Sequence, residues 1–313
     1  MKQRTAVMSN LPNARKKARF IPFFIALPFL ILVFVFSYLP LLGWVYAFFD
    51  YRPPLKLFQC DFVGFKWFTA LISNSAQVGN LLRVLANTFA ISGLNIITSV
   101  IPIAFAVFLM EIRVPWYKKL VQTFTTIPNF ISWVLVYSFA FAIFSNDGFF
   151  NNLFTDLGLR DSPVNYLATT ESVWASMVLW YLWKFMGWNA IMYIAVIIGI
   201  DQELYEAATV DGAGRFQRMW HITIPSILPT FFVLLMLSIA NFLNNGMDQY
   251  YVFQNPINQN RIEVLDLYVY NIGVGNSSYS IATAIGMVKS IVSVTLLFFV
   301  NNMSRIVRGE TIV

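Results

Sequence analysis

The stretch EAATVDGAGRFQRMWHITIP, residues 206–225, lies between two strongly apolar runs of the chain, at about 171–200 and 226–250. It contains two carboxylates, two arginines, two glycines and the only histidine of the protein. Charged side chains are costly inside a bilayer, whereas each flanking run is long enough to span one. The stretch is therefore expected to be a loop outside the bilayer that joins two spanning helices.

The composition of the whole chain agrees with a membrane protein. Of its 313 residues, 58% are hydrophobic and only 12% are charged, which excludes a soluble domain of this size. Strands of a membrane barrel would alternate in polarity over about 10 residues, and the apolar runs do not. The expected fold is all-α and integral to the membrane, with six transmembrane helices at about 22–49, 84–110, 118–144, 171–200, 226–250 and 281–302.

Charge placement predicts the orientation. A basic cluster, RKKAR at 15–19, precedes an apolar run that is too long for a signal peptide and is interpreted as an uncleaved anchor. With both termini in the cytoplasm, thirteen of the 21 Lys and Arg residues fall inside and six outside, in agreement with the positive-inside rule. The expected divisions are a basic cytoplasmic N-terminus at 1–21, a six-helix transmembrane domain at 22–302 with the loop at 201–225, and a cytoplasmic tail at 303–313.

Several chemical functions lack the residues that they need. The sequence contains no phosphate-binding loop, no C-x-x-C and no H-E-x-x-H. With Cys60 as the only cysteine and His221 as the only histidine, a metal or haem site is not expected. The net charge of +6 is spread around the spans, so orientation explains it better than nucleic-acid binding. We expect no catalytic residues, no metal and no cofactor, and hence a conduit or a structural subunit.

The loop at 201–225 is expected to form a helix–turn–helix. Good helix formers at 204–208 are predicted to continue the preceding span, and Asp211-Gly212-Ala213-Gly214 is predicted to break it. Glu206 and Asp211 can accept charge-assisted hydrogen bonds from a partner, while Phe216 and Trp220 can fill a groove or lie against the chain itself. A docking helix and a short structured loop both remain open on the residues alone.

The same stretch carries a family resemblance. The pattern E-A-A-x-x-D-G-A followed by I-x-I-P resembles the EAA loop of ABC importer permeases, with Ile224 where leucine is usual. Other stretches, FSYLPLLGWVYAFFDYRP at 36–53, FVGFKWF at 62–68, TIPNFISW at 126–133 and YSIATAIGMVKS at 279–290, resemble the maltose-type carbohydrate permeases. The most similar branch is the one that serves complex oligosaccharides and polysaccharide fragments.

The resemblance implies a type I ABC importer. Its expected partners are a second homologous permease subunit, an ABC ATPase dimer that binds the ATP, an extracytoplasmic solute-binding lipoprotein, an oligosaccharide and the lipid bilayer. The residues expected to couple the chain to the ATPase are Glu206, Ala207, Ala208, Asp211, Gly212 and Gly214. The alternative is an ion-coupled secondary sugar transporter, which needs a carboxylate inside a span; Asp248 is the only candidate.

Polar residues in the fifth span suggest a sugar pathway. Ser238, Asn241, Asn244 and Asn245 fall within about two helical turns, and amides in lipid need a cavity or another helix as partner. Hydrogen bonding between helices is the simpler alternative. In the maltose-type permeases the corresponding stretch contributes sugar contacts, so the resemblance implies a substrate pathway here.

The fourth span adds an aromatic and a cationic candidate within LWKFMGWN, residues 182–189. Trp188 could stack on a pyranose ring, and Gly187 would allow close approach. Lys184 could pair with the carboxylate of an acidic sugar, with Asp248, or with an acidic group of the partner permease. The resemblance implies a structural role for Lys289, and Asn129 beside Pro128 is a further candidate for the substrate pathway.

Overall fold

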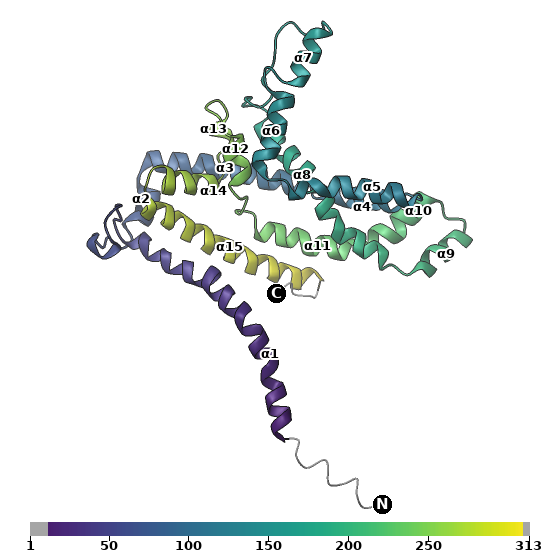
Figure 1. Ribbon diagram of the computed structural model, residues 1–313, viewed down its shortest axis with the longest axis horizontal. Coiled ribbons are helices and arrows are strands. Elements are labelled where there is room, and N and C mark those ends of the chain that lie inside the picture. The colour runs from purple at the N-terminus through teal and green to yellow at the C-terminus, as the bar shows by residue number, and fades with distance from the viewer. Residues whose placement is uncertain (1–11, 309–313) are drawn as a thin grey trace, which may run out of the picture.

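The computed structural model describes residues 12–308, which form helices, connecting turns and one isolated antiparallel bridge between Phe49 and Phe62. Six helical stretches are long and apolar enough to cross a membrane, in agreement with the predicted number. They are Pro22–Phe48, Ser75–Met110, Trp133–Asp156, Val173–Ile198, Arg215–Ala240 and Tyr279–Arg305. Figure 1 shows a central body of roughly aligned helices from which α1 projects in one direction and α6–α7 in another.

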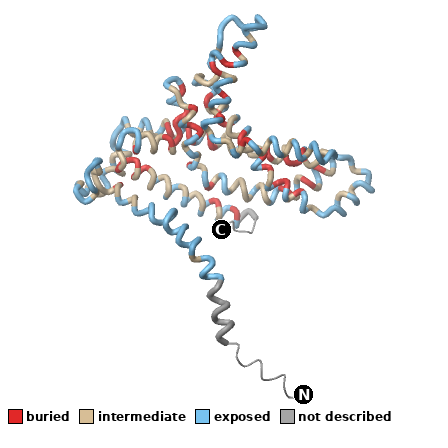
Figure 2. Tube along the Cα trace, viewed as in Figure 1, coloured by how far each residue is buried: buried red, intermediate tan, exposed pale blue. Residues whose placement is uncertain are grey.

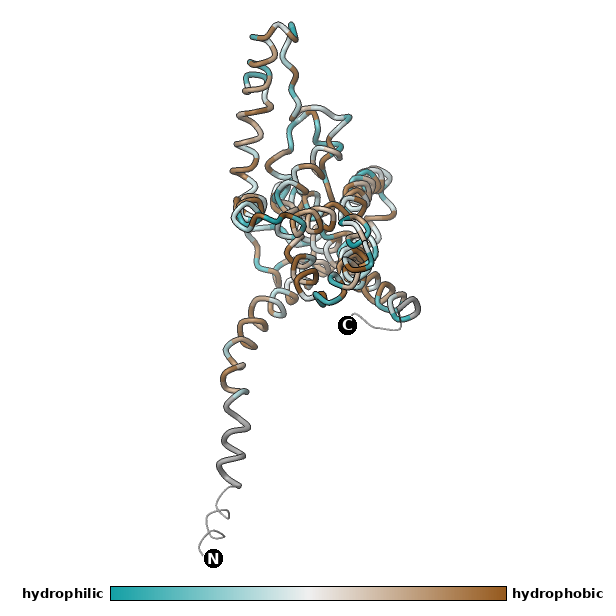
Figure 3. Tube along the Cα trace, turned by 90° about the vertical axis from the view of Figure 1, so that its right-hand side faces the viewer, coloured by the Kyte–Doolittle hydropathy of each residue, from teal (hydrophilic) through white to brown (hydrophobic). Residues whose placement is uncertain are grey.

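The first span leaves the body of the molecule. It consists of α1 (Pro12–Val33), a π-helical turn (Phe34–Tyr38) and a 3₁₀ helix (Leu39–Phe48). None of the residues in its most apolar window is buried, and hydrophobic residues colour much of it in Figure 3. An apolar helix of this length needs lipid or another subunit around it.

The second span begins earlier than expected, because the Asn74 side chain caps α3 by accepting hydrogen bonds from the backbone of Ala76 and Gln77. The helix α3 (Ser75–Thr98) then continues almost directly into α4 (Val100–Met110). The short helix α2 (Lys66–Ser73) precedes it at the end of the body opposite to α9 and α10, as Figure 1 shows.

The third predicted span, a continuous helix at 118–144, is wrong. The chain forms α5 (Pro115–Thr126), a 3₁₀ turn (Ile127–Phe130), α6 (Trp133–Phe144) and α7 (Phe149–Asp156). Pro128 cannot supply a backbone donor to a continuing helix, and Ser132 instead caps α6 by accepting from the Leu135 N–H at 3.4 Å. The α6–α7 arm therefore turns away from α5 (Figure 1).

The fourth and fifth spans flank the polar loop. Helix α8 (Val173–Ile198) is followed by α9 (Gln202–Val210), α10 (Arg215–Arg218), a π-helical stretch (Met219–Thr223) and α11 (Ile224–Ala240). The predicted fifth span at 226–250 is too long, because the α-helix ends at Ala240. The chain then passes through α12 (Asp248–Phe253), α13 (Gln259–Ile262), α14 (Leu265–Tyr270), a π-helical turn (Asn271–Gly275) and α15 (Tyr279–Arg308).

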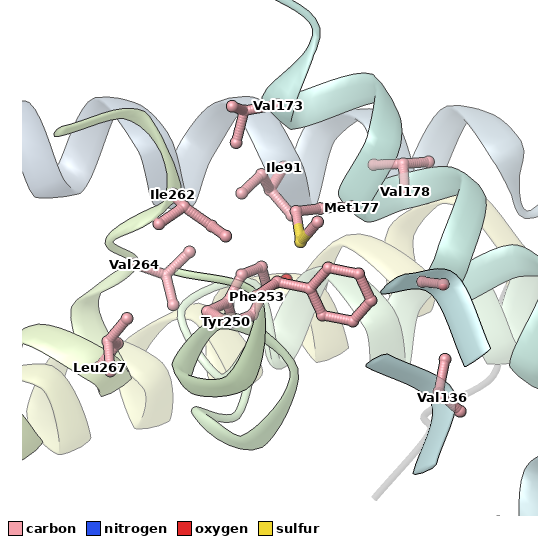
Figure 4. Close-up of a cluster of buried hydrophobic side chains, with 11 residues drawn as sticks. Ile91, Val136, Val173, Met177, Val178, Tyr250, Phe253, Ile262, Val264 and Leu267 are labelled. Atoms are coloured by element: carbon pink, nitrogen blue, oxygen red, sulfur yellow. The ribbon is translucent and has the colours of Figure 1, made fainter. Parts of the chain in front are cut away.

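Buried side chains hold the central body together, as the red segments in Figure 2 show. The largest cluster joins α3, α6, α8 and α12–α14, with Tyr250 and Phe253 of α12 in its centre (Figure 4). A second cluster joins α4, α8 and the α10–α11 region, and a third joins α3, α14 and α15. These contacts fix α3, α4, α8 and the first part of α11 relative to one another.

Candidate functional site

A cavity of about 440 Å³ lies where α3, α4, α8 and α11 meet. Its polar lining consists of Ser92, Asn95, Thr98, Ser99, Tyr181, Asn189, Tyr193, Ser238, Asn241, Asn244 and Asn245. The remaining lining is aliphatic or aromatic, and includes Trp188 and Phe231. None of the described residues that line it carries a charge. The cavity therefore offers amides, hydroxyls and aromatic faces to a ligand.

The amide-rich residues predicted in the fifth span all line this cavity, but most of them do so from irregular backbone. Ser238 lies in α11 and donates to the Leu234 carbonyl at 2.9 Å. Asn241 is the residue after the helix, and its side chain donates to the Leu237 carbonyl at 3.0 Å. The predicted placement of Asn241, Asn244 and Asn245 inside a regular helix is wrong, because side-chain bonds of this kind compete with helical backbone bonds.

Three elements hold the irregular segment Asn241–Met247 in place. On α3, Ser92 donates to the Phe242 carbonyl at 2.6 Å and accepts from the Asn245 amide at 2.9 Å. On α14, Asp266 accepts from the Gly246 N–H at 2.8 Å, and Lys289 of α15 forms an ion pair with the same carboxylate. Gly246 has a φ of +73°, a conformation that favours glycine. The predicted structural reading of Lys289 agrees with this contact.

Asn95 supplies an unpaired acceptor at the cavity. Its side-chain oxygen is buried and has no hydrogen-bond partner among the described residues. A buried polar atom without a partner costs about 1–3 kcal/mol, so it marks a place for a water molecule or a ligand hydroxyl. Asn95 is not among the predicted residues, although Ser92, Asn95 and Ser99 recur at helical spacing in the second span.

The two candidates from the fourth span, Trp188 and Lys184, lie in different surroundings. Trp188 lines the cavity and packs edge-to-face on Phe130, with ring centroids 5.7 Å apart. Lys184 is 4% exposed and does not line the cavity. Gly187 does allow close approach, but of a backbone: a Cβ atom there would lie 2.3 Å from the Thr125 carbonyl oxygen.

Lys184 instead closes the break between α5 and α6. Its ammonium donates to the carbonyl oxygens of Pro128 at 2.8 Å and Asn129 at 3.0 Å, and also to that of Ile131. An ammonium has three donors, and all three are used. The alternative pairing with Asp248 does not form, since no ion pair joins these two described residues. Asn129, the weak pathway candidate, contributes its backbone carbonyl to this site.

The polar loop after α8 is a separate helix–turn–helix. Asp201 caps α9 by accepting from the Glu203 N–H at 3.0 Å, so α9 does not continue the preceding span as predicted. The predicted break is present: α9 ends at Val210, and Gly212 adopts a φ of +80°. Gly214 then starts α10, where its N–H donates to the Gln217 side chain at 2.7 Å.

Arginines fasten this turn to the rest of the chain. Arg215 forms an ion pair with Glu111 at the end of α4 at 3.0 Å, and also donates to the Glu111 carbonyl at 2.7 Å. Arg218 donates to the Thr209 hydroxyl at 2.8 Å across the turn. Tyr205 and Thr223 share a hydroxyl–hydroxyl bond of 2.8 Å. Arg215 thus ties the helix pair to α4, while the other two bonds hold α9 against the residues that lead into α11.

Two carboxylates and two aromatic side chains of the turn are exposed. The side chains of Glu206 and Asp211 are exposed and form no hydrogen bond or ion pair with another part of the described chain. Phe216 is 77% exposed and Trp220 is 68% exposed. Of the two alternatives for these aromatics, packing against the chain itself is not observed. Carboxylates beside exposed aromatics form a surface that a protein partner can cover.

Within residues 12–308 no group of three or more His, Cys, Asp and Glu residues could hold a metal ion. Two features therefore stand out chemically: the uncharged cavity at the centre and the carboxylate-bearing turn at one end of the body (Figure 1). The first can bind a neutral, hydroxyl-bearing ligand, and the second can bind a protein.

Several known proteins are similar to this chain. A family model described as the binding-protein-dependent transport system inner membrane component matches residues 100–308. Protein LplB of Bacillus subtilis (strain 168) is 37% identical over 285 residues, which cover 90% of this chain and 88% of LplB. The polygalacturonan/rhamnogalacturonan transport system permease protein YteP of the same organism is 37% identical over 281 residues, with 89% and 86% covered.

A solved structure is also similar. The crystal structure of a bacterial ABC transporter involved in the import of the acidic polysaccharide alginate contains a chain that superposes with a TM-score of 0.81 at 31% identity. The superposition covers 93% of this chain and 97% of that one. The same transporter in complex with a periplasmic protein bound to an alginate pentasaccharide also gives a TM-score of 0.81.

Proposed function

Since this chain belongs to the family of binding-protein-dependent transport system inner membrane components, we propose that it forms half of the pathway of an oligosaccharide importer. The chain is a multi-pass protein of the cytoplasmic membrane and the permease component of an ABC importer, not itself an enzyme. A binding protein belongs to such a system. The matches give no support to an ion-coupled secondary transporter.

The substrate that we propose is an oligosaccharide. The observation that carries this proposal is the uncharged cavity with the unpaired Asn95 oxygen beside Ser238, Asn241 and Asn245. Amide oxygens accept from sugar hydroxyls and amide N–H groups donate to them, while Trp188 offers a face for the apolar side of a pyranose ring. The names of YteP and of the alginate importer, both concerned with polysaccharide fragments, support the same class of substrate.

The α9–α10 turn is the proposed site of attachment to the ATPase subunits, which bind the ATP. Glu206 and Asp211 would receive hydrogen bonds from the ATPase, Ala207 and Ala208 would allow close approach, and Gly212 and Gly214 would fix the turn. The bond of Arg215 to Glu111 at the end of α4 and the bond of Arg218 to Thr209 within the turn support the idea that movement of the turn is passed to the spans as a rigid unit. The proposed location of this turn is the cytoplasm.

A second homologous permease is the proposed other half of the pathway. The exposed apolar window of the first span supports this, because a subunit packed on α1 would cover apolar residues that the chain itself leaves open. The proposed domain division stays at 1–21, 22–302 and 303–313. Residues 1–11 and 309–313 lie outside the described residues, so only parts of the two cytoplasmic ends are described.

The test of this function is transport by the reconstituted system. The permease pair, the ATPase and the binding protein would be placed in liposomes and supplied with arabinotriose, trigalacturonate and an alginate trisaccharide. We expect ATP-dependent uptake of at least one trisaccharide, and a decrease of about tenfold in Asn95→Leu, which loses the acceptor for a sugar hydroxyl. Uptake of none of them, or uptake independent of ATP, would contradict the proposal.

A further inference from the structure

A second polar cavity, of about 500 Å³, lies beyond α12. Its walls come from the segment after α12, from α13 and α14, and from the π-helical turn Asn271–Gly275. In Figure 1 these elements lie over the centre of the body and away from α9 and α10. Its volume is within the range of sites that hold small ligands. We call it the outer pocket.

The base of the outer pocket is rigid and has no unbalanced charge. Glu263 is buried, accepts from Arg83 of α3 at 3.0 Å and accepts from the Asn271 amide at 2.9 Å. The Asn87 amide donates to the Glu263 carbonyl at 3.1 Å and to the Asn260 carbonyl at 3.0 Å. Because the Glu263 carboxylate is already paired with the Arg83 guanidinium, a cationic ligand is not needed to balance its charge.

The rim of the outer pocket carries unused hydrogen-bonding groups. The amide side chains of Gln254, Gln259 and Asn276 line the pocket and form no side-chain hydrogen bond with another described residue. Tyr268 lines it as well. Burial raises the pKa of the Tyr268 phenol above its ordinary value, and the nearby Glu263 carboxylate adds to this, so the phenol keeps its proton as a donor.

We propose that the outer pocket binds one or two sugar units of the oligosaccharide while it passes from the binding protein to the central cavity. This inference rests on the proposed function and deepens it. Three free amides and a phenol around a charge-balanced base match hydroxyl groups, which both donate and accept. An apolar ligand would cover these groups without offering them partners, at a cost of about 1–3 kcal/mol for each group that it buries.

The outer pocket is also connected to the central cavity through the protein. Tyr268 and Asp266 lie on the same short helix, α14, and Asp266 accepts from the Gly246 N–H in the segment that lines the central cavity. The two pockets are separated along the chain by α12 alone. A ligand in the outer pocket therefore contacts the helix that fixes the amides of the next site.

The experiment uses the complete transporter in nanodiscs and liposomes. Hydrogen–deuterium exchange of residues 254–276 would be measured with and without millimolar arabinotriose, trigalacturonate and alginate trisaccharide, in the absence of the binding protein. Transport would be measured in wild type and in the double variant Gln254→Leu/Asn276→Leu. Neither side chain has a bond within the described chain to lose, and Gln254→Ala/Asn276→Ala serves as a second variant in which no large apolar group is added.

The matched control is Asn80→Leu, the same amide-to-leucine change at an exposed position of α3 outside the pocket. We expect a transported trisaccharide to slow exchange in 254–276 of the wild type and of the control. In both double variants this protection should disappear, and the KM for the sugar-loaded binding protein should rise about tenfold, the equivalent of one or two lost hydrogen bonds.

Three results would overturn the inference in different ways. Absent protection with an unchanged KM, while Asn95→Leu still impairs transport, would remove the outer pocket and leave the oligosaccharide function intact. In a separate exchange measurement with the sugar-free binding protein added, protection of residues 254–276 without any sugar would identify a protein contact instead. Failure of wild type to transport any of the trisaccharides would remove the proposed function and this site together.

Discussion

The α9–α10 turn and the segment Asn241–Met247 are both polar interruptions of apolar spans, but the first leaves carboxylates on the surface and the second places amides in the wall of a cavity. In the turn, the basic residues are bonded to the chain and the carboxylates of Glu206 and Asp211 are exposed. The segment is bonded to the Asp266 carboxylate of α14, and its amides line a cavity. Both regions contain polar residues. The groups that have no partner within the chain distinguish a protein-binding surface from a ligand-binding one.

Each interruption is also fixed by bonds to distant elements. The turn is tied to α4 through Glu111, and the segment is tied to α3, α14 and α15. A polar group that must meet a partner in a defined position benefits from such support, because less conformational entropy is lost on binding. The predictions below remove either the free groups or the supporting bonds of the two regions.

The largest effect is expected from Glu206→Lys in the turn. If Glu206 accepts hydrogen bonds from the ATPase, the reversed charge faces basic groups of the partner, and transport should fall by more than about 100-fold. The measurement is ATPase co-purification together with uptake. The matched control is Glu203→Lys, an exposed carboxylate on the same helix that should retain most activity. Normal co-purification and uptake in Glu206→Lys would show that the free carboxylate has no partner there.

Lys184→Met should have the next largest effect, through stability. Removing the ammonium leaves three carbonyl oxygens at the α5–α6 break without a donor, which costs about 3 kcal/mol. We expect the melting temperature of the purified protein to fall by about 5–10 °C. Because Lys184 does not line the cavity, uptake of neutral and acidic trisaccharides by the remaining folded protein should fall equally. A selective loss of the acidic one would restore the predicted role in binding a sugar carboxylate.

These two regions also differ in how far the sequence predicts them. The helix–turn–helix could be predicted because it depends on local features within residues 201–225. These are a glycine with positive φ, a helix break and exposed carboxylates. The continuation of α8 into α9 was predicted wrongly, since the Asp201 cap was not recognised.

The cavity depends on contacts between distant residues and was predicted less well. The residues of its amide cluster were expected to face a cavity or another helix and do line the cavity, whereas their role in a substrate pathway stays a prediction. The end of α11 at Ala240 was not predicted, because the bonds that hold the irregular segment come from Ser92 and Asp266, which lie outside it in the sequence. The same reason explains Lys184: its partners are backbone carbonyls at a helix break around Pro128, which composition and periodicity do not reveal. The apolar first span was predicted easily, since its length and composition suffice.

A change in the support of the cavity segment should have a smaller effect. Asp266→Asn keeps the size of the side chain but removes the charge that pairs with Lys289 and weakens the bond to Gly246. We expect uptake to fall about tenfold, mainly through KM, because the amides of the segment lose their fixed position.

The rescue variant for this prediction is Asp266→Asn/Lys289→Met. It removes the uncompensated ammonium, whose burial is costly without a partner, and should recover stability but not KM. Full recovery of both quantities would mean that Asp266 matters only for folding. An unchanged KM in the single variant would show that the segment holds its position without α14.

The smallest effect is expected from His221→Ala. This variant tests whether the partner-binding surface of the turn is limited to its carboxylates and exposed aromatic residues. His221 is exposed, and its Nδ1 atom contacts the Gln217 carbonyl at 2.9 Å, one turn earlier in the same helical stretch. That contact does not join the turn to the body, and Trp220 beside it provides the larger exposed surface. A surface substitution of this kind changes stability by about 0.5 kcal/mol or less, so uptake and ATPase activity should change less than about twofold. A tenfold decrease with intact folding would place His221 in the contact with the ATPase, and the partner-facing surface would then extend from the carboxylates of α9 past the arginines to the start of α11.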